Sequence, residues 1–379
     1  DGGKTYTNMG LKSSRAINRI VIDPRNNDTV FVAATGSLWG PGGERGIYKT
    51  ADGGKTWKQV LKVDDDTGAN EVVMDPTNSQ IIYATMYQRR RTACCFNGGG
   101  AGSGIFKSTD GGETWTKLKG GVLDGPLGRI AVDVYKKRPN ILYALIEGPS
   151  QGRGGGGGRA GGGGRGGGQQ EVDPKVPTGL WRSDDSGATW SKVSNTNPRP
   201  MYFSQVNIDP TDPDVVYLGG VGLHQAMDGR KKIATDIARP IHDDVHAMWI
   251  NPNNPQHVLI GNDGGLAMSY DRGRNWKFVP NLPVGLFYHV SVDNAVPYNI
   301  CGGMQDNYNW CGPSAVRSSA GIGNHEWNTL QGGDGFVVLQ DPTDYRIAFT
   351  ESQDGNMTRV DRVTFETMNI RPTPPPGQP

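Results

Sequence analysis

One short pattern returns seven times along this chain of 379 residues, and it limits the possible folds more than any other feature. An apolar stretch leads into an aspartate or asparagine, usually followed by proline, and a second β-rich stretch comes next. The residues at this point are Asp23, Asp75, Asp133, Asp209, Asn251, Asp293 and Asp341. They lie 52, 58, 76, 42, 42 and 48 residues apart, so the base period is in the low forties. A four-stranded propeller blade has this length, and the sequence therefore predicts an all-β propeller of about seven blades.

A second pattern, Ser/Thr-x-Asp-x-Gly-x-Thr-Trp, follows most copies and is called the Asp-box below. It occupies residues 50–57, 108–115 and 183–190, and 269–276 with an asparagine in place of the threonine. Each box follows a strand-like run, so we expect it to form the hairpin between the third and fourth strands of a blade. The aspartate would accept backbone N–H groups in this turn, and the tryptophan would pack between neighbouring sheets. We interpret these residues as markers of the fold and not as catalytic groups: Asp52, Trp57, Asp110, Trp115, Asp185, Trp190, Asp271 and Trp276.

The two ends of the chain leave the closure of the propeller open. Residues 1–6 repeat the second half of a box, and the chain after residue 370 is rich in proline. We predict a propeller over residues 1–370 and a Pro-rich linker or tail over 371–379. The N-terminal segment could supply the outer strand that closes the ring. Alternatively, the chain is a piece of a longer protein with a larger ring or two propellers, which we favour because natural chains rarely begin inside a turn motif.

Two insertions and four cysteines interrupt the repeat. Residues 150–172 are mostly glycine with regularly spaced arginines, which is typical of a flexible loop or of an adhesive Arg-Gly-Gly segment. The second insertion covers residues 306–335. Cys301 and Cys311 fall on neighbouring predicted strands, so we expect a disulfide between them in an exported protein. Cys94 and Cys95 are adjacent and lack a Cys-x-x-Cys partner, so they do not indicate a zinc site.

Charge and hydropathy argue against some partners. The chain has 39 Lys and Arg against 38 Asp and Glu, a net charge of +1. This balance gives no bulk attraction to nucleic acid or to an anionic membrane. No apolar run reaches the roughly 18 residues that a membrane span needs. We therefore predict no nucleic-acid partner, no membrane-spanning segment and no cofactor.

The boxes resemble those of the Asp-box propellers, which include sialidases, xyloglucanase-type glycoside hydrolases, photosystem-assembly propellers and the sortilin luminal domain. Residues 243–252, 261–265 and 301–307 are similar to large exported bacterial proteins of the sortilin-like, "BNR glycosyl hydrolase" kind. The resemblance covers the whole chain apart from the glycine-rich insertion. It implies a periplasmic, extracellular or outer-surface protein whose partner is a protein, a peptide or a polysaccharide. The name hydrolase in that family usually follows from the fold, and a fold does not determine a function.

The register of the repeat predicts which residues surround the channel mouth. The first strand of each propeller blade lines the central channel, and positions four and five before the repeat aspartate lie at its entry end. Polar residues at these positions, together with an aspartate in an entry loop, form the predicted ring: Arg19, Glu71, Arg129, Gln205, His246, Tyr288, His289 and Asp334. Arginines suit carboxylates or sugar hydroxyls, and a tyrosine can stack on a ligand. The same side chains would also line a channel that is simply filled with water.

Several specific chemistries can be compared with the sequence. The Tyr/Phe-Arg-Ile-Pro motif of sialidases has its nearest match at residues 345–348, which fall on a second-strand position, so sialidase activity is not expected. A xyloglucanase-type mechanism needs two facing carboxylates about 6.5–9.5 Å apart, which that family places between two propellers. Asp243 and Asp244 are our candidates for one of the two. His242 and His246 could hold a metal ion, and Asp64 and Asp66 could bind Ca²⁺, although we favour a solvated acidic turn for the latter pair.

Two functions of different kinds therefore remain. The first is a non-catalytic binding or assembly propeller that holds a peptide or protein partner at the channel mouth, and this is our prediction. The second is a xyloglucanase-type glycoside hydrolase that acts on an extracellular polysaccharide. Four of the nine tryptophans belong to boxes, which leaves few for sugar binding, among them Trp39, Trp310 and Trp327. An aromatic-lined groove with two facing carboxylates would favour the hydrolase.

Overall fold

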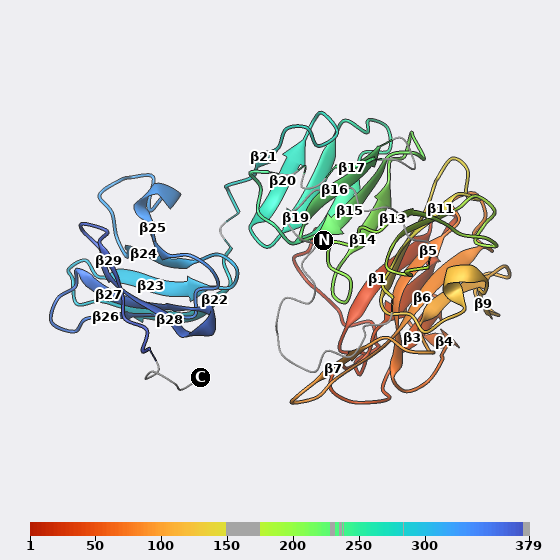
Figure 1. Cartoon of the computed structure of the whole chain (residues 1–379), viewed down its shortest axis with the longest axis horizontal. Helices are drawn as coiled ribbons and strands as arrows, with labels where there is room; N and C mark the ends of the chain where they lie inside the picture. The colour runs from red at the N-terminus through yellow and green to blue at the C-terminus, as the bar shows by residue number, and fades with distance from the viewer. Residues whose placement is uncertain (149–174, 228–231, 235–236, 238, 283, 374–379) are drawn as a thin grey trace. The chain divides into compact units, whose positions relative to one another are not determined.

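The computed structural model of the chain is almost entirely β-structure and contains seven antiparallel sheets (Figure 1). It describes residues 1–148, 175–227, 232–234, 237, 239–282 and 284–373. The predicted insertion at 150–172 lies outside these residues. Six sheets have four strands each, and the second has a short fifth strand. The all-β propeller class predicted from the repeat is confirmed.

The chain divides into two compact units, which are described separately. The first unit comprises residues 1–262 and 266–278, and the second comprises residues 263–265 and 279–379. The sheets of the first unit are formed by β1 (Ile17–Asp23), β2 (Asn26–Ala34), β3 (Gly46–Thr50) and β4 (Lys58–Leu61); β5 (Thr67–Met74), β6 (Ile82–Arg91), β7 (Phe96–Gly98), β8 (Gly104–Ser108) and β9 (Thr116–Lys117); β10 (Ile130–Val134), β11 (Leu142–Ile146), β12 (Gly179–Ser183) and β13 (Ser191–Ser194); β14 (Gln205–Ile208), β15 (Val216–Gly220), β16 (Gly222–Met227) and β17 (Lys232–Ala234); and β18 (Val245–Ile250), β19 (Val258–Asn262), β20 (Gly265–Ser269) and β21 (Lys277–Phe278).

The second unit contains the last two sheets and two of the three short helical turns of the described residues. Its strands are β22 (Phe287–Val292), β23 (Asn299–Met304), β24 (Asn309–Pro313) and β25 (Asn328–Gln331), then β26 (Val337–Gln340), β27 (Ile347–Ser352), β28 (Asn356–Asp361) and β29 (Thr367–Asn369). The helices of the described residues are three single 3-10 turns, η1 (Gly121–Leu123), η2 (Asn324–Glu326) and η3 (Gln353–Gly355). None of these is long enough to cross a membrane.

The core of the first unit lies between successive sheets, as expected from the strand pattern. Residues one and three positions before the repeat aspartate are buried where a sheet precedes them, as Val72, Ile130 and Val132 are. The equivalent residues of the first sheet, Ile20 and Ile22, are 58% and 54% exposed. In the second to fifth sheets, the first strand therefore packs apolar side chains against the sheet before it.

The Asp-box hairpins share one hydrogen-bond pattern, which the second box illustrates. Asp110 accepts a bond from the Thr114 backbone N–H at 2.9 Å and another from the Thr114 hydroxyl. Ser108 donates to Asp110 at 2.8 Å and accepts the Gly112 N–H at 2.8 Å. The hairpin joins the third and fourth strands of its sheet, where the sequence placed it. Trp115 packs against an apolar cluster formed by the first two sheets.

The N-terminal segment does not form the outer strand that one of our alternatives assigned to it. Residues 1–16 contain no strand. The fourth strand of the seventh sheet is β29, which comes from residues 367–369 near the other end of the sequence. Asp1 still makes half of a box, because its carboxylate accepts the backbone N–H groups of Gly3 and Lys4, each at 3.0 Å. Local turn chemistry is therefore satisfied there without a strand.

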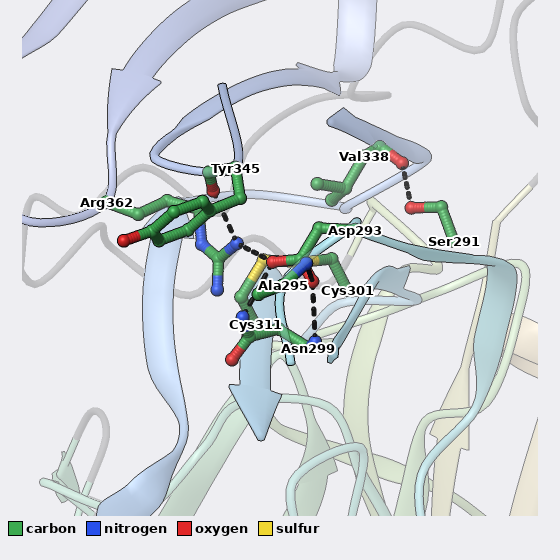
Figure 2. The surroundings of a disulfide bond; sticks show 9 residues. All are labelled: Ser291, Asp293, Ala295, Asn299, Cys301, Cys311, Val338, Tyr345 and Arg362. Carbon is green, nitrogen blue, oxygen red and sulfur yellow. Dashed lines mark hydrogen bonds and ion pairs between the residues drawn. A yellow bond between two sulfur atoms is a disulfide. The ribbon is translucent and has the colours of Figure 1, made fainter. Parts of the chain in front are cut away.

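A disulfide and a buried aspartate join the strands of the second unit (Figure 2). Cys301 and Cys311 are direct partners on β23 and β24, and they form a disulfide. Asp293, the repeat aspartate, accepts the backbone N–H of Asn299 at 2.7 Å and pairs with Arg362 at 2.7 Å. Since Arg362 follows β28, this ion pair links the sixth sheet to the seventh.

Candidate functional site

The predicted ring residues of the first unit do lie together, at one end of its sheets. Arg19, Arg129, Gln205 and His246 are at the start of the first strands or directly before them, and Glu71 lies in the middle of the longer strand β5. We call this the entry end of the first unit. The loops that join second strands to third strands reach the same end, because the strands are antiparallel.

Several ring side chains bind a side chain or a backbone carbonyl of the neighbouring sheet. Arg19 forms a two-point ion pair with Glu71, with nitrogen–oxygen distances of 2.9 and 3.0 Å. Arg129 is buried, and its guanidinium donates to the carbonyl of Ser204. The Gln205 amide donates to the carbonyl of His246. These contacts stabilise the channel wall, so each of these groups already has a partner inside the protein.

Glu147, which the sequence analysis did not select, is the most perturbed acid at this end. It follows β11, is buried, and accepts the backbone N–H of Arg129 at 2.8 Å. Burial raises its pKa to about 7, against the opposing effects of this hydrogen bond and of the Arg129 charge. The neutral carboxylic acid is therefore the favoured form of Glu147 below neutral pH.

Glu147 should make the stability of the protein depend on pH. Its pKa is raised in the folded state, so the stabilisation is complete below about pH 4.5 and is lost as the pH rises through about 7. In wild type, this fall in the free energy of unfolding should amount to about 3 kcal/mol, since one pKa unit corresponds to about 1.4 kcal/mol. The Glu147→Gln variant should not show it. Chemical denaturation at pH 4.5, 6 and 8 measures the slope.

The matched control for this measurement is Glu113→Gln. Glu113 is exposed and bound to Lys49 and Lys58, and these hydrogen bonds lower its pKa. The ionisation of Glu113 therefore affects stability only below about pH 4.5, outside the pH range in which Glu147 affects it. An unchanged slope in Glu147→Gln would contradict the assignment.

The other sequence-predicted candidates of the first unit are not brought together. Asp64 accepts the backbone N–H of Asp66 at 2.8 Å, and Asp66 pairs with Arg90. Asp243 and Asp244 directly precede β18. His242 accepts an amide hydrogen bond from Asn262 through its carbonyl, and the His246 ring stacks on Phe203 at 4.0 Å between centroids. Within the described residues, no group of three metal-binding side chains includes any of the four predicted metal ligands: Asp64, Asp66, His242 and His246.

The second unit contains an acid cluster, which we define as Asp263, Asp306 and Asp334. Asp306 lies in the turn between β23 and β24, and its backbone N–H donates to Asp334 at 2.7 Å. Asp334 also accepts a bond from the Gln353 amide at 2.6 Å. Carboxylate oxygens of Asp263 and Asp306 lie within 4.8 Å of each other. Three carboxyl groups therefore meet in one place, and only Asp334 was predicted.

The neighbours of Asp306 give it the properties of a proton donor. Burial raises its pKa to about 6, and the charges and hydrogen bonds of Asp334 and Asp263 act in the same direction. Two carboxylates that are close together resist being ionised at the same time. Asp306 is half-buried and remains accessible to a ligand. A carboxylic acid that keeps its proton up to about pH 6 is suited to general acid catalysis.

Aromatic side chains surround this acid cluster. Tyr288 lies 5.3 Å from Phe336 between ring centroids and is 42% exposed. Burial raises the pKa of Tyr288, and the charges of Asp334 and Asp306 raise it further, so the phenol is near both acids. Tyr308, two residues after Asp306, is 44% exposed. His289, the other predicted residue here, is exposed on β22. Acid groups and exposed aromatic faces are thus combined within the second unit.

Asp263 and Asp306 had a signal in the sequence that was not used. Both belong to the stretches 261–265 and 301–307, on which the resemblance to sortilin-like proteins was based. Their positions in two hairpin turns, each between a second and a third strand, are equivalent in the repeat. An alignment of these turns between successive blades would have selected Asp263 and Asp306. In the same way, the alignment of the first strands selected Tyr288 and His289.

Similarity to known proteins agrees with this architecture. The Sortilin-Vps10 family (sortilin, neurotensin receptor 3) matches residues 1–141. Xyloglucanase Xgh74A of Acetivibrio thermocellus is 28% identical over 285 residues, which cover 71% of this chain and 26% of that enzyme. The xyloglucanase of Hypocrea jecorina (strain QM6a) is 25% identical over 316 residues, which cover 74% of this chain and 35% of that enzyme. The chain thus spans about a quarter to a third of the length of these relatives.

One solved structure supports the fold directly. The GH74 enzyme of Niastella koreensis matches with a TM-score of 0.57 at 14% identity, covering 95% of this chain and 60% of that one. Together with the seven sheets, this likeness defines the class of protein as a β-propeller. More specifically, residues 1–141 are similar to the Sortilin-Vps10 family, as the boxes suggested. Its sequence relatives include xyloglucanases.

Proposed function

We propose that this chain is a polysaccharide-binding propeller of a xyloglucanase-type glycoside hydrolase, in which Asp306 is the general acid. The observation that carries the proposal is the acid cluster with its exposed aromatic neighbours. A glycosidase of this type needs a protonated carboxyl group that donates to the leaving oxygen of the glycosidic bond. Asp306 meets this need through its raised pKa, and Tyr288 and Tyr308 offer faces on which a sugar ring can pack.

The second catalytic carboxylate is not another member of the acid cluster. An inverting mechanism separates acid and base by about 6.5–9.5 Å to leave room for water, and a retaining one by about 5–5.5 Å. Asp306 is hydrogen-bonded to Asp334, which is too close for either arrangement. Asp334 and Asp263 therefore act as positioning residues that hold the proton on Asp306. The base is then a carboxylate outside the acid cluster.

A non-catalytic binding propeller, our prediction from the sequence, is the second candidate. It is favoured by the entry end of the first unit, where Glu71 is paired with Arg19 and Glu147 is bound to the Arg129 backbone. Neither acid is available for catalysis in this arrangement. Such a wall suits the holding of a peptide or protein partner at the channel mouth without any reaction.

We also propose that the protein is exported. The polysaccharide substrates implied by the xyloglucanase relatives support this location. The Cys301–Cys311 disulfide supports it as well, because disulfides persist in oxidising compartments outside the cytoplasm.

The test is an assay of the full-length gene product with xyloglucan. We expect binding of the polysaccharide together with release of new reducing ends, and kcat/KM should fall as the pH rises above about 6 because Asp306 then loses its proton. Binding without any release would favour the second candidate. If the protein neither binds xyloglucan nor releases reducing ends from it, the proposal is overturned.

A further inference from the structure

Two arginines at the entry end of the first unit differ from the others. Other arginines of this unit bind carboxylates, hydroxyls or carbonyls: Arg19, Arg45, Arg90, Arg129, Arg182 and Arg272. Arg89 and Arg199 do not. The Nε atom of each is buried and has no hydrogen-bond partner among the described residues.

Arg89 and Arg199 come from segments that are fixed against each other. Arg89 lies near the end of β6, and Arg199 lies in the loop that precedes β14. The two segments are joined by Tyr87, whose hydroxyl donates to the carbonyl of Met201 at 3.2 Å. The backbone N–H of Arg199 donates to the Ser204 hydroxyl at 2.6 Å, which holds the loop at its other end. The arginines are therefore held in place by the fold and not by acids of their own.

Aromatic rings support both guanidinium groups. Arg89 lies over the Tyr87 ring at 5.9 Å, and Arg199 lies over the Phe203 ring at 5.8 Å. Burial lowers the pKa of Arg89, while Tyr87 and Tyr202 act in the opposite direction, so Tyr202 is also near. Tyr202 is 58% exposed and lies in the same loop as Arg199. An exposed aromatic face thus stands beside two guanidinium groups that have no acceptor within the described part of the chain.

A buried guanidinium Nε–H without an acceptor is costly, because burial removes water from a polar group and no protein group replaces it. Such a group is retained where a ligand supplies the missing acceptor. Guanidinium binds planar carboxylates through two parallel hydrogen bonds, so a carboxylate is the acceptor that fits its geometry. The adjacent exposed tyrosine favours a ring next to that carboxylate.

We propose that Arg89, Arg199 and Tyr202 form a subsite for the carboxylate-bearing sugar of an acidic polysaccharide, a uronate. Arg89 and Arg199 bind the carboxylate, and the Tyr202 ring packs against the sugar. This inference rests on the proposed polysaccharide function and adds to it a subsite for glycans that carry uronates. A peptide carboxylate has the same head group, but it offers no ring beside the carboxylate for Tyr202.

The test is the binding of oligogalacturonate to the full-length gene product at low salt, measured by calorimetry. Wild type should bind the oligouronide and should bind its methyl ester at least tenfold more weakly, because esterification removes the charge. Arg89→Gln and Arg199→Gln should each weaken binding of the acid by about tenfold or more, the usual effect of losing a charge-assisted hydrogen bond. Tyr202→Ala, at an exposed position, should weaken binding of acid and ester alike.

Arg138→Gln is the matched control. Arg138 also lies over a tyrosine ring at 5.9 Å, that of Tyr135, but in the turn between β10 and β11 at the opposite end of the sheets. The Arg138→Gln variant should bind oligogalacturonate as wild type does. Thermal melts of every variant show whether a loss of binding comes from unfolding, and Tyr202→Ala serves if an arginine variant does not fold.

Other outcomes overturn the inference. It fails if the acid and its ester bind equally, if folded arginine variants bind as wild type does, or if the oligouronide does not bind. Polyglutamate that binds more tightly than the oligouronide would show that the carboxylate comes from a peptide. Turnover of xyloglucan is measured in parallel, so this subsite can fail while the proposed hydrolase activity holds.

Discussion

Replacing Asp306 with asparagine should reduce glycan hydrolysis by a factor of about 10² to 10⁴, the usual contribution of a positioned general acid. Asparagine has nearly the same shape, and the hydrogen bond to Asp334 comes from the backbone of residue 306, so the turn should persist. Only the transferable proton is removed. The measurement is kcat/KM on xyloglucan for the full-length gene product between pH 4 and 8.

The pH profile separates this role from a structural one. In wild type, the decline above about pH 6 should follow deprotonation of Asp306, and the variant should lack that limb. Asp344→Asn is the control, because Asp344 pairs with Arg346 in an exposed turn between β26 and β27. Its rate and profile should be those of wild type. An Asp306→Asn protein with full activity would remove this residue from the mechanism.

Replacing Arg45 with alanine should destabilise the protein by about 3 kcal/mol or more, since buried carbonyls that lose a charged donor each cost about 1–3 kcal/mol. Arg45 is fully buried, and its guanidinium donates to four carbonyls, those of Gly42, Thr35, Ser37 and Gly40. These bonds hold the loop between β2 and β3, which carries Trp39.

Denaturant midpoints and hydrogen exchange of residues 35–45 measure this effect. A lysine at position 45 has one nitrogen and cannot reach four carbonyls, so Arg45→Lys should restore little of the loss. Arg25→Ala is the control, because Arg25 is an exposed arginine whose bond to the Pro76 carbonyl is 3.2 Å long. Equal midpoints for Arg45→Ala and Arg25→Ala would contradict the account.

The repeat was sufficient to predict the sheets because it depends on local chemistry. The repeat aspartate and the box each fix their own turn within a few residues, as Asp75 does by accepting the Thr77 and Asn78 N–H groups. Periodicity therefore located strands and hairpins. The alternative in which the N-terminal segment forms an outer strand was wrong, because a turn motif fixes its own turn and does not reveal whether a partner strand is available.

The candidate sites depended on contacts that no short pattern records. Asp306 meets Asp334 although 28 residues separate them, and the insertion between them contains η2 and β25. Arg89 differs from Arg90 because Asp66 pairs with one of them and not with the other. Ring positions such as Arg19 and Glu71 were predicted together because they share a register, but their pairing with each other follows from sheet-to-sheet packing.

The Asp-box turns and the entry loops lie at opposite ends of a sheet, which affects how such proteins can diverge. Asp-boxes lie in the turns between third and fourth strands, whereas Trp39 lies in a segment between a second and a third strand and Arg89 lies near the end of a second strand. Antiparallel strands put these two sets of turns at opposite ends of a sheet. Mutations that alter ligand choice therefore need not touch the residues that specify folding. A lineage can exchange its entry loops, and with them its partners, while its boxes stay recognisable.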